Sequence, residues 1–169
     1  MMRCLKILCV LAVPFAGPAA AQDLEFDNRP TGICVNNVHS EHSHATFDQC
    51  IGLAAEKCME TNPGGWSTVV MGGCLDMELQ YWDKQLNVNY KKLMTVSKKL
   101  DKENGEYAPS QAKALREMQR AWIKFRDEKC GYEMSQWGGG TGGSPALASC
   151  LMRETAMQSD YLFTSAMEF

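Results

Sequence analysis

Histidine is scarce in this sequence. The chain has three, His39, His42 and His44, and all of them lie before residue 45. A serine or cysteine nucleophile activated by histidine needs an imidazole inside the folded core, whereas these three stand in a polar segment that favours a solvated stretch. With Glu41 they form a weak candidate for a transition-metal site, and their spacing is not that of two histidines on one helix face.

An excess of positive charge is also absent. The chain has 17 lysines and arginines against 20 aspartates and glutamates, a formal net charge of −3. No basic patch is interleaved with aromatic residues, so we expect no nucleic-acid partner. An acidic protein of this kind suits a basic partner.

The chain lacks an apolar run long enough for a stable membrane anchor. Its start, MMRCLK, is basic, the following ILCVLAVPFA is apolar, and AAA at residues 19–21 is a small-residue cleavage motif. This order predicts a signal peptide over residues 1–21, cleaved near Ala21, and a periplasmic or secreted product. Because Arg3 and Lys6 leave with that segment, 15 basic and 20 acidic residues remain, a net charge of −5.

No two cysteines form the close CxxC pair that is typical of metal-thiolate sites. Cys4 and Cys9 fall within the predicted signal peptide, which leaves an even number of cysteines in an exported chain and predicts three disulfides. The cysteines concerned are Cys34, Cys50, Cys58, Cys74, Cys130 and Cys150.

No segment of useful length alternates between apolar and polar residues as a strand would. Apolar residues instead recur at helical spacing in four segments, which begin at Thr46, near Gly73, at Pro109 and at Pro145. Residues 22–45 look irregular. We therefore predict an all-α fold, an antiparallel four-helix bundle with three disulfides, over residues 46–169.

The bundle constrains the disulfide pairing without fixing it. Cys58, Cys74, Cys130 and Cys150 all lie near helix ends that an antiparallel bundle brings to one end of the molecule, which leaves Cys34 to pair with Cys50. Among the four, pairing of neighbours along the chain is slightly preferred over the crossed alternative.

Arg126 stands within the apolar stripe of the third predicted helix, within about 40° of Trp122 on a helical wheel. A buried guanidinium needs a carboxylate and further hydrogen bonds. Asp83 is the first choice of partner, with Glu78 and Glu154 as reserves. The predicted structural network consists of Asp83, Asn87, Gln119, Arg126 and Thr155.

The same network argues against catalysis. A glycosidase needs one acid with a raised pKa, whereas an adjacent arginine would lower the pKa of Asp83. We predict no catalytic residue, no cofactor and no enzymatic activity.

Three motifs give the chain a resemblance to a known family. They are Asp-x-x-Leu-Asn-x-x-Tyr over residues 83–90, Gln-x-x-Trp-x-x-x-Arg-Asp-x-x-Cys over residues 119–130, and Cys-x-x-x-x-Thr over residues 150–155. Together, over residues 74–162, the chain resembles the lysozyme inhibitor LprI-like family of exported bacterial proteins. The resemblance implies an all-helical exported inhibitor of wall-cleaving lysozymes. The chain departs from the family at Glu154, where a leucine is frequent, and at Gln158, where an arginine is usual.

The glycine-rich segment WGGGTGGSP is a candidate partner-binding loop, with Trp137, Gly139, Gly140, Thr141 and Ser144 as its contact residues. It could offer hydrogen-bond donors to a carboxylate-lined cleft. A plain helix connection, with Trp137 packed back on the bundle, is the favoured interpretation of such a loop.

Two functions follow from these observations. The first is an exported non-enzymatic binding protein that inhibits a lysozyme, or binds another basic wall-active protein, by occlusion. The alternative is a cell-envelope structural or stress-related interaction protein with a different partner.

Overall fold

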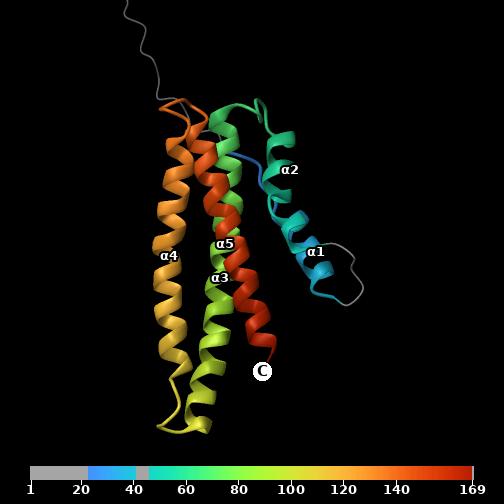
Figure 1. Ribbon diagram of the computed structural model, residues 1–169. Coiled ribbons are helices and arrows are strands. Elements are labelled where there is room, and N and C mark those ends of the chain that lie inside the picture. Colours follow the sequence, from blue (N-terminus) through green and yellow to red (C-terminus); the bar gives the residue numbers. More distant parts are fainter. Residues whose placement is uncertain (1–22, 41–45, 169) are drawn as a thin grey trace, which may run out of the picture.

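The computed structural model describes residues 23–40 and 46–168. These residues form five α-helices and one short 3₁₀ helix, and no strand occurs among them (Figure 1). The elements are α1 (Arg29–Val38), η1 (Phe47–Cys50), α2 (Leu53–Thr61), α3 (Thr68–Asn104), α4 (Gln111–Ser135) and α5 (Gly143–Met167).

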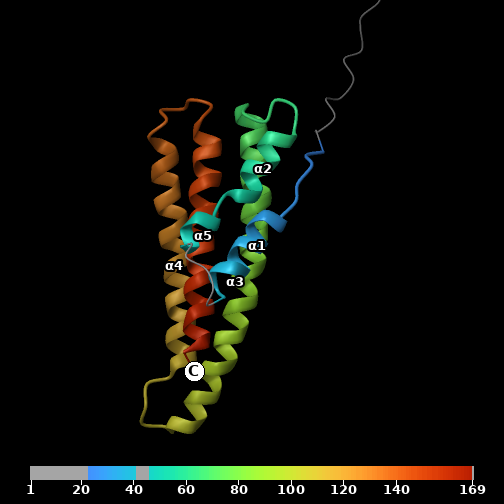
Figure 2. The ribbon, with the colours of Figure 1, turned by 90° about the vertical axis from the view of Figure 1, so that its right-hand side faces the viewer.

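The three long helices α3, α4 and α5 lie side by side as a bundle, with α4 antiparallel to the other two (Figures 1 and 2). The most extensive contact is between α3 and α5, which run in the same direction. The shorter α2 packs against the start of α3, and α1 lies lower on the same side. The predicted all-α bundle is confirmed, with α2–α5 as its four expected helices and α1 as an addition.

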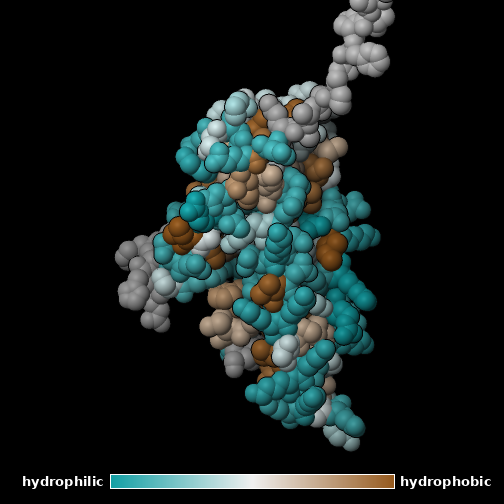
Figure 3. Space-filling model, turned by 180° about the vertical axis from the view of Figure 1, so that it is seen from behind, coloured by the Kyte–Doolittle hydropathy of each residue, from teal (hydrophilic) through white to brown (hydrophobic). Residues whose placement is uncertain are grey.

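Two clusters of apolar side chains form the core. The cluster beside α2 is built around Trp82, which is 1% exposed, and Met152. The second lies further along α3 and joins Leu86, Leu93, Leu115 and Leu162. The face opposite to that of Figure 1 is mostly hydrophilic, with hydrophobic residues in separate patches (Figure 3). No helix in the described part of the chain is both long and apolar enough to cross a bilayer.

Two of the three long helices, α3 and α4, begin at a serine whose side chain caps the first turn. The Ser67 hydroxyl accepts a hydrogen bond from the Val70 amide, and α3 therefore begins at Thr68 rather than near Gly73 as the apolar pattern suggests. The apolar pattern could not show this, because a cap residue is polar and stands outside the repeat.

The start of α4 is held by an acid on α3. The Asp101 carboxylate accepts hydrogen bonds from the Ser110 hydroxyl (2.7 Å) and from the amides of Gln111 (2.6 Å) and Ala112 (3.2 Å). The Ser110 bond, followed by those of the two amides, lowers the pKa of Asp101. This carboxylate thus fixes the turn that joins α3 to α4.

The three predicted disulfides are confirmed, and all three join neighbours along the chain. Cys34–Cys50 links α1 to η1, Cys58–Cys74 links α2 to α3, and Cys130–Cys150 links α4 to α5. The preferred local pairing is therefore correct, and the crossed alternative is wrong.

The expectation that residues 22–45 are irregular is wrong for Arg29–Val38, which form α1. Pro30 stands in the first turn of this helix, where its fixed φ angle and missing N–H are tolerated. Thr31 is fully buried, and the bridge through Cys34 ties the helix to η1. Tertiary contacts thus stabilise a helix of 10 residues that would be marginal in isolation.

The segment after Thr46 also differs from the expected continuous helix. It forms η1, and α2 then begins at Leu53. Gly52 separates the two elements with a φ of +100°, a left-handed conformation that glycine adopts readily. The break turns the first amides of α2 toward α3.

Candidate functional site

Arg126 lies at the surface between α4 and α5, with 19% of its side chain exposed. Its Nε and Nη2 atoms donate to Asp127 Oδ1 at 2.9 and 2.8 Å, and Nη1 donates to Thr155 Oγ1 at 3.3 Å. The guanidinium carbon also lies 5.1 Å from the centroid of the Trp122 ring. This is cation–π range, so three different contacts hold the guanidinium in place.

The predicted pair between Asp83 and Arg126 is wrong. Asp83 is exposed, and its Oδ2 atom accepts a hydrogen bond from Asn87 at 3.0 Å. Arg126 pairs instead with Asp127, the next residue on its own helix. The helical wheel gives the direction of a Cα–Cβ bond, but a long arginine side chain can turn along its own helix toward a nearer acid.

The other predicted network residues divide into separate contacts. Gln119 is buried, and its Oε1 atom accepts a hydrogen bond from Gln158 Nε2 at 3.0 Å. Thr155 is fully buried beneath Arg126. Gln158 stands where the family usually has an arginine, and its bond to Gln119 was not predicted. The five predicted residues therefore do not form one continuous network.

Neither reserve acid contacts Arg126. Glu154 Oε1 forms an ion pair with Lys129 Nζ at 2.6 Å, and this pair joins α4 to α5. Glu78 is fully buried where α3 contacts α1 and α2, and it accepts hydrogen bonds from both of those helices.

Glu78 has a structural role that the sequence analysis missed. Its Oε1 atom accepts hydrogen bonds from the Gly52 amide (2.8 Å), the Thr31 hydroxyl (3.0 Å) and the Trp82 indole (3.1 Å). Its Oε2 atom accepts one from the Ala55 amide at 2.7 Å. The carboxylate therefore caps the N-terminus of α2 from another helix. The feature of the sequence that could have indicated this role is the position of Glu78 within the apolar stripe of α3.

An open groove of about 460 Å³ lies between α3 and α4. Three arginines of α4 and one acid of α3 supply its charged groups, and Tyr90 and Trp122 its aromatic groups. The charged residues are Asp83, Arg116, Arg120 and Arg126. Arg126 is therefore not locked in the core as predicted, but lines a surface that a ligand can reach.

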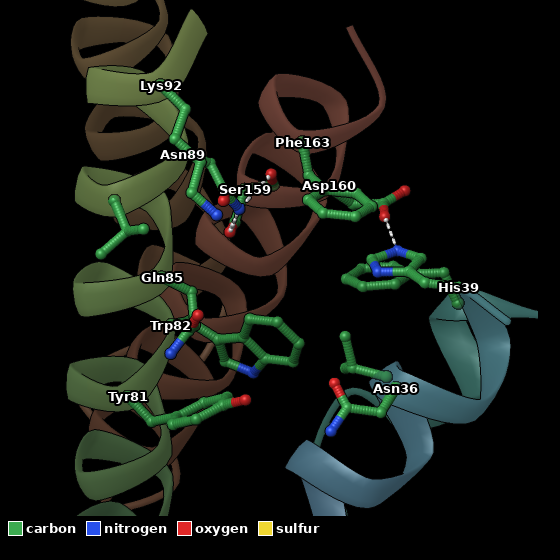
Figure 4. Close-up of a pocket in the computed structure, with 13 residues that line it drawn as sticks. Asn36, His39, Tyr81, Trp82, Gln85, Asn89, Lys92, Ser159, Asp160 and Phe163 are labelled. Carbon is green, nitrogen blue, oxygen red and sulfur yellow. Dashed lines mark hydrogen bonds and ion pairs between the residues drawn. The ribbon is translucent and has the colours of Figure 1, made fainter. Parts of the chain in front are cut away.

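A second, smaller cavity of about 150 Å³ lies between α1 and the α3–α5 pair (Figure 4). At its edge His39 Nε2 lies 2.8 Å from Asp160 Oδ1, and the imidazole stacks on the Phe163 ring at 4.2 Å. Ser159 precedes Asp160 in the sequence, but its hydroxyl accepts a hydrogen bond from Asn89 at 3.1 Å. The contacts described thus tie His39 to a carboxylate and a ring, and Ser159 to an amide.

Tyr81 forms another wall of this cavity, with its hydroxyl 3.6 Å from the position that a Cβ would take at Gly32 of α1. Burial, and then the negative charge of Glu78, raise the pKa of the Tyr81 hydroxyl. The metal hypothesis at the histidines involves His42 and His44, which lie outside the described residues. No group of three side chains suited to a metal ion occurs within the described ranges.

The predicted partner-binding loop is shorter than expected, because α5 begins at Gly143 and Ser144 lies in its first turn. Trp137 is 54% exposed, and a Cβ placed at Gly142 would clash with its ring. Thr141, like Gly139 and Gly140 beside it, is exposed. The tryptophan therefore packs against its own connector and still presents about half of its surface.

The described residues define a small all-helical protein whose helices are joined by three disulfides. The sequence model of the family described as lysozyme inhibitor LprI matches residues 58–162. This match covers more than half of the chain, and the protein belongs to this family. The matched region contains α3, α4 and most of α5, together with the groove, whereas α1 and η1 precede it.

One relative is an uncharacterized protein of Rhizobium meliloti (strain 1021), 31% identical over 85 residues. The similarity covers 48% of this chain and 61% of the relative, so the match spans less than two thirds of that protein's length. No solved structure matches the chain.

Proposed function

We propose that this protein is an exported, non-enzymatic inhibitor that binds a lysozyme and occludes the cleft in which the bacterial wall is cleaved. The observation that carries the proposal is the match of the lysozyme inhibitor family to residues 58–162. That region includes α3, α4, most of α5 and two of the three disulfides.

Export is supported by two features of the chain. The basic, apolar and small-residue segments of residues 1–21 have the order of a signal peptide. Three disulfides join the described helices, and such bonds persist in oxidising compartments such as the periplasm. A periplasmic or secreted protein would share its compartment with wall-cleaving enzymes.

A binding role, rather than catalysis, is supported by the contacts of the candidate polar groups. Arg126 is held by Asp127 and Thr155, and Asp83 accepts from Asn87. Glycoside hydrolysis calls for two carboxylates facing one another across a bond. In the groove, Asp83 faces arginines.

Two surfaces are available to contact the enzyme. The connector with Trp137 and Thr141 offers an exposed ring, a hydroxyl and backbone amides at one end of the bundle. The groove between α3 and α4 offers guanidinium groups. Both surfaces present donors, and a cleft that contains carboxylates requires donors.

The test is a lysozyme assay on bacterial cell walls, with mature protein from Gln22 onward purified in its oxidised form. Inhibition that rises with protein concentration, for at least one lysozyme class, is the expected result. Reduced and alkylated protein is the control, because unfolding should remove the inhibition. Full lysozyme activity at several-fold molar excess, across more than one class, would overturn the proposal and favour an envelope protein with a different partner.

A further inference from the structure

We infer that the groove between α3 and α4 is the surface that engages the wall-cleaving enzyme, with Arg116 and Arg120 placed on the paired carboxylates of its cleft. This inference rests on the proposed function and adds to it the contact surface and the chemistry of recognition. The occupant is thus the acidic active-site cleft of a glycosidase.

Arg116 and Arg120 are the unpaired cations of the groove. Both are exposed, and within the described residues neither makes an ion pair or a side-chain hydrogen bond. On the same helix, Lys113 pairs with Glu117 and Lys129 with Glu154. The two guanidinium groups are therefore available for carboxylates from outside the chain.

The spacing of this pair suits two catalytic acids. Arg116 and Arg120 are one helical turn apart, a rise of about 6 Å. Paired carboxylates of glycosidases lie roughly 5 to 9.5 Å apart across the bond they cleave. Arginine also binds a carboxylate with two parallel hydrogen bonds, which a lysine cannot reproduce. One helix face could therefore meet both acids at once.

The end of the groove beyond these two residues is held rigid. Arg126 is fixed by Asp127 and Thr155 and stacks on Trp122. A surface that is already ordered loses less conformational entropy on binding. Trp122 and Tyr90 add aromatic surface in the same groove, a residue class that is enriched in protein interfaces.

The distribution of charge fits a basic enzyme with an acidic cleft. Without residues 1–21 the exported chain carries a net charge of −5, which attracts a basic protein at long range. The groove has the opposite local sign, with three arginines against Asp83. The rest of the chain thus steers the encounter, and the groove matches the charge of the cleft.

Two other features, the cavity beside His39 and the connector around Trp137, fit a protein cleft less well. The cavity beside His39 has a volume of about 150 Å³, too small to admit a segment of a folded partner. The connector around Trp137 offers neutral donors, whereas the groove offers charged ones, and charge-assisted hydrogen bonds are roughly twice as strong.

The experiment compares inhibition by three variants that carry substitutions at exposed positions. Arg116→Glu/Arg120→Glu reverses the charge of the groove. Lys91→Glu/Lys98→Glu applies the same change in net charge to exposed lysines of α3 that do not line the groove. Trp137→Ala tests the connector. Circular dichroism and thermal unfolding would check that each variant folds.

We expect the groove variant to need about a hundredfold more protein for half-inhibition, because reversal places like charges together in a desolvated contact. The lysine variant should stay within about threefold of the unchanged protein, since it leaves the groove as it is. A loss in Trp137→Ala that equals or exceeds the loss in the groove variant would overturn the inference in favour of the connector. Undiminished inhibition by the groove variant would overturn the inference and leave the proposed function intact. An equal loss in the lysine variant would also overturn it, as a general charge effect. Absence of inhibition by the unchanged protein would overturn the proposed function itself.

A second readout tests the pairing directly. The affinity of the protein for the inhibited lysozyme is measured with that enzyme's two catalytic acids intact and with both replaced by amides. The amide enzyme should bind the unchanged protein about tenfold or more weakly, and Arg116→Met/Arg120→Met should bind both enzymes equally. If replacing the enzyme's acids weakens binding equally for the unchanged protein and for Arg116→Met/Arg120→Met, the arginines do not contact those acids.

Discussion

The Glu78 carboxylate lies 2.7 Å from the amide nitrogen of Ala55, although 23 residues separate them in the sequence. The same carboxylate accepts from Gly52, Thr31 and Trp82. One acid on α3 therefore binds α1 and the first turn of α2 to the bundle. It holds α2 by accepting from backbone amides that a helix N-terminus leaves without partners, and α1 by accepting from the Thr31 hydroxyl.

Replacing this acid should be costly. Glu78→Ala leaves buried donors on three elements without an acceptor, and we expect the free energy of unfolding to fall by about 3 kcal/mol or more. Urea unfolding followed by circular dichroism would measure the loss.

Glu78→Gln is the matched control, because it keeps one oxygen acceptor and the side-chain volume. It should cost less than the alanine variant, though still more than about 1 kcal/mol, since its NH₂ group would face an amide donor. A loss below about 0.5 kcal/mol in the alanine variant would show that the cap contributes little.

The partner of Arg126 can be tested by a pair of single substitutions. Asp127→Ala removes the acid that accepts from Nε and Nη2, and should lower stability by about 0.5–1 kcal/mol, a modest value because the pair is partly exposed. Asp83→Ala should change stability by less than about 0.5 kcal/mol, since its side-chain contact is with Asn87 on the exposed face of α3. Thermal unfolding of both variants gives the comparison. A larger loss of stability in Asp83→Ala than in Asp127→Ala would instead support Asp83 as the partner of Arg126.

The Cys130–Cys150 bridge closes the connector between α4 and α5. Replacing both cysteines by alanine should cost about 2–4 kcal/mol of stability, mainly through greater freedom of the unfolded chain. The groove that we propose as the contact with lysozyme is formed by α3 and α4, so inhibition should survive at temperatures well below the unfolding midpoint. The variant Cys34→Ala/Cys50→Ala is the comparison, because that bridge lies outside the region matched by the family. Unchanged thermal stability after removal of the Cys130–Cys150 bridge would contradict this expectation.

Asp101 makes stability depend on acid pH. Hydrogen bonds from Ser110 and from the first amides of α4 lower the pKa of its carboxyl group below the ordinary 3.8. Its contribution is therefore present above the unfolded value and is lost as the pH falls through the lower folded value. Asp101→Asn should reduce stability at neutral pH and make little difference in strong acid. Chemical unfolding at several pH values would show this. A difference between the two proteins that does not shrink in acid would contradict the assignment.

The sequence predicts the parts of this fold that depend on repeated patterns. The apolar stripe from Leu75 to Leu93 marks α3, because core burial repeats at the helical period. Chain neighbours among the cysteines pair as preferred, since short connections bring the ends of successive helices together. Both predictions concern features that many residues specify together.

Features that depend on one side chain were harder to predict. Pro30 favours an irregular segment in a sequence pattern, although proline is common in the first turn of a helix. The helix α1 itself depends on the Cys34–Cys50 disulfide and on buried Thr31. Glu78 stands in the apolar stripe, but backbone amides, not an arginine, satisfy it. Arg126 lies beside Trp122 as the helical wheel predicts, yet its guanidinium pairs with Asp127 at the surface and not with an acid in the core. A helical wheel fixes Cβ directions and does not fix where a long side chain ends.

Occlusion of the lysozyme cleft is tested most directly by competition with a soluble oligosaccharide that occupies the same cleft. The affinity of the mature protein for the inhibited lysozyme would be measured by calorimetry at increasing oligosaccharide concentration. If the protein covers the cleft, its apparent dissociation constant should rise in proportion to the oligosaccharide concentration, about elevenfold at ten times the sugar's own dissociation constant. An affinity that stays constant while the cleft is saturated with sugar would show that the protein binds elsewhere on the enzyme.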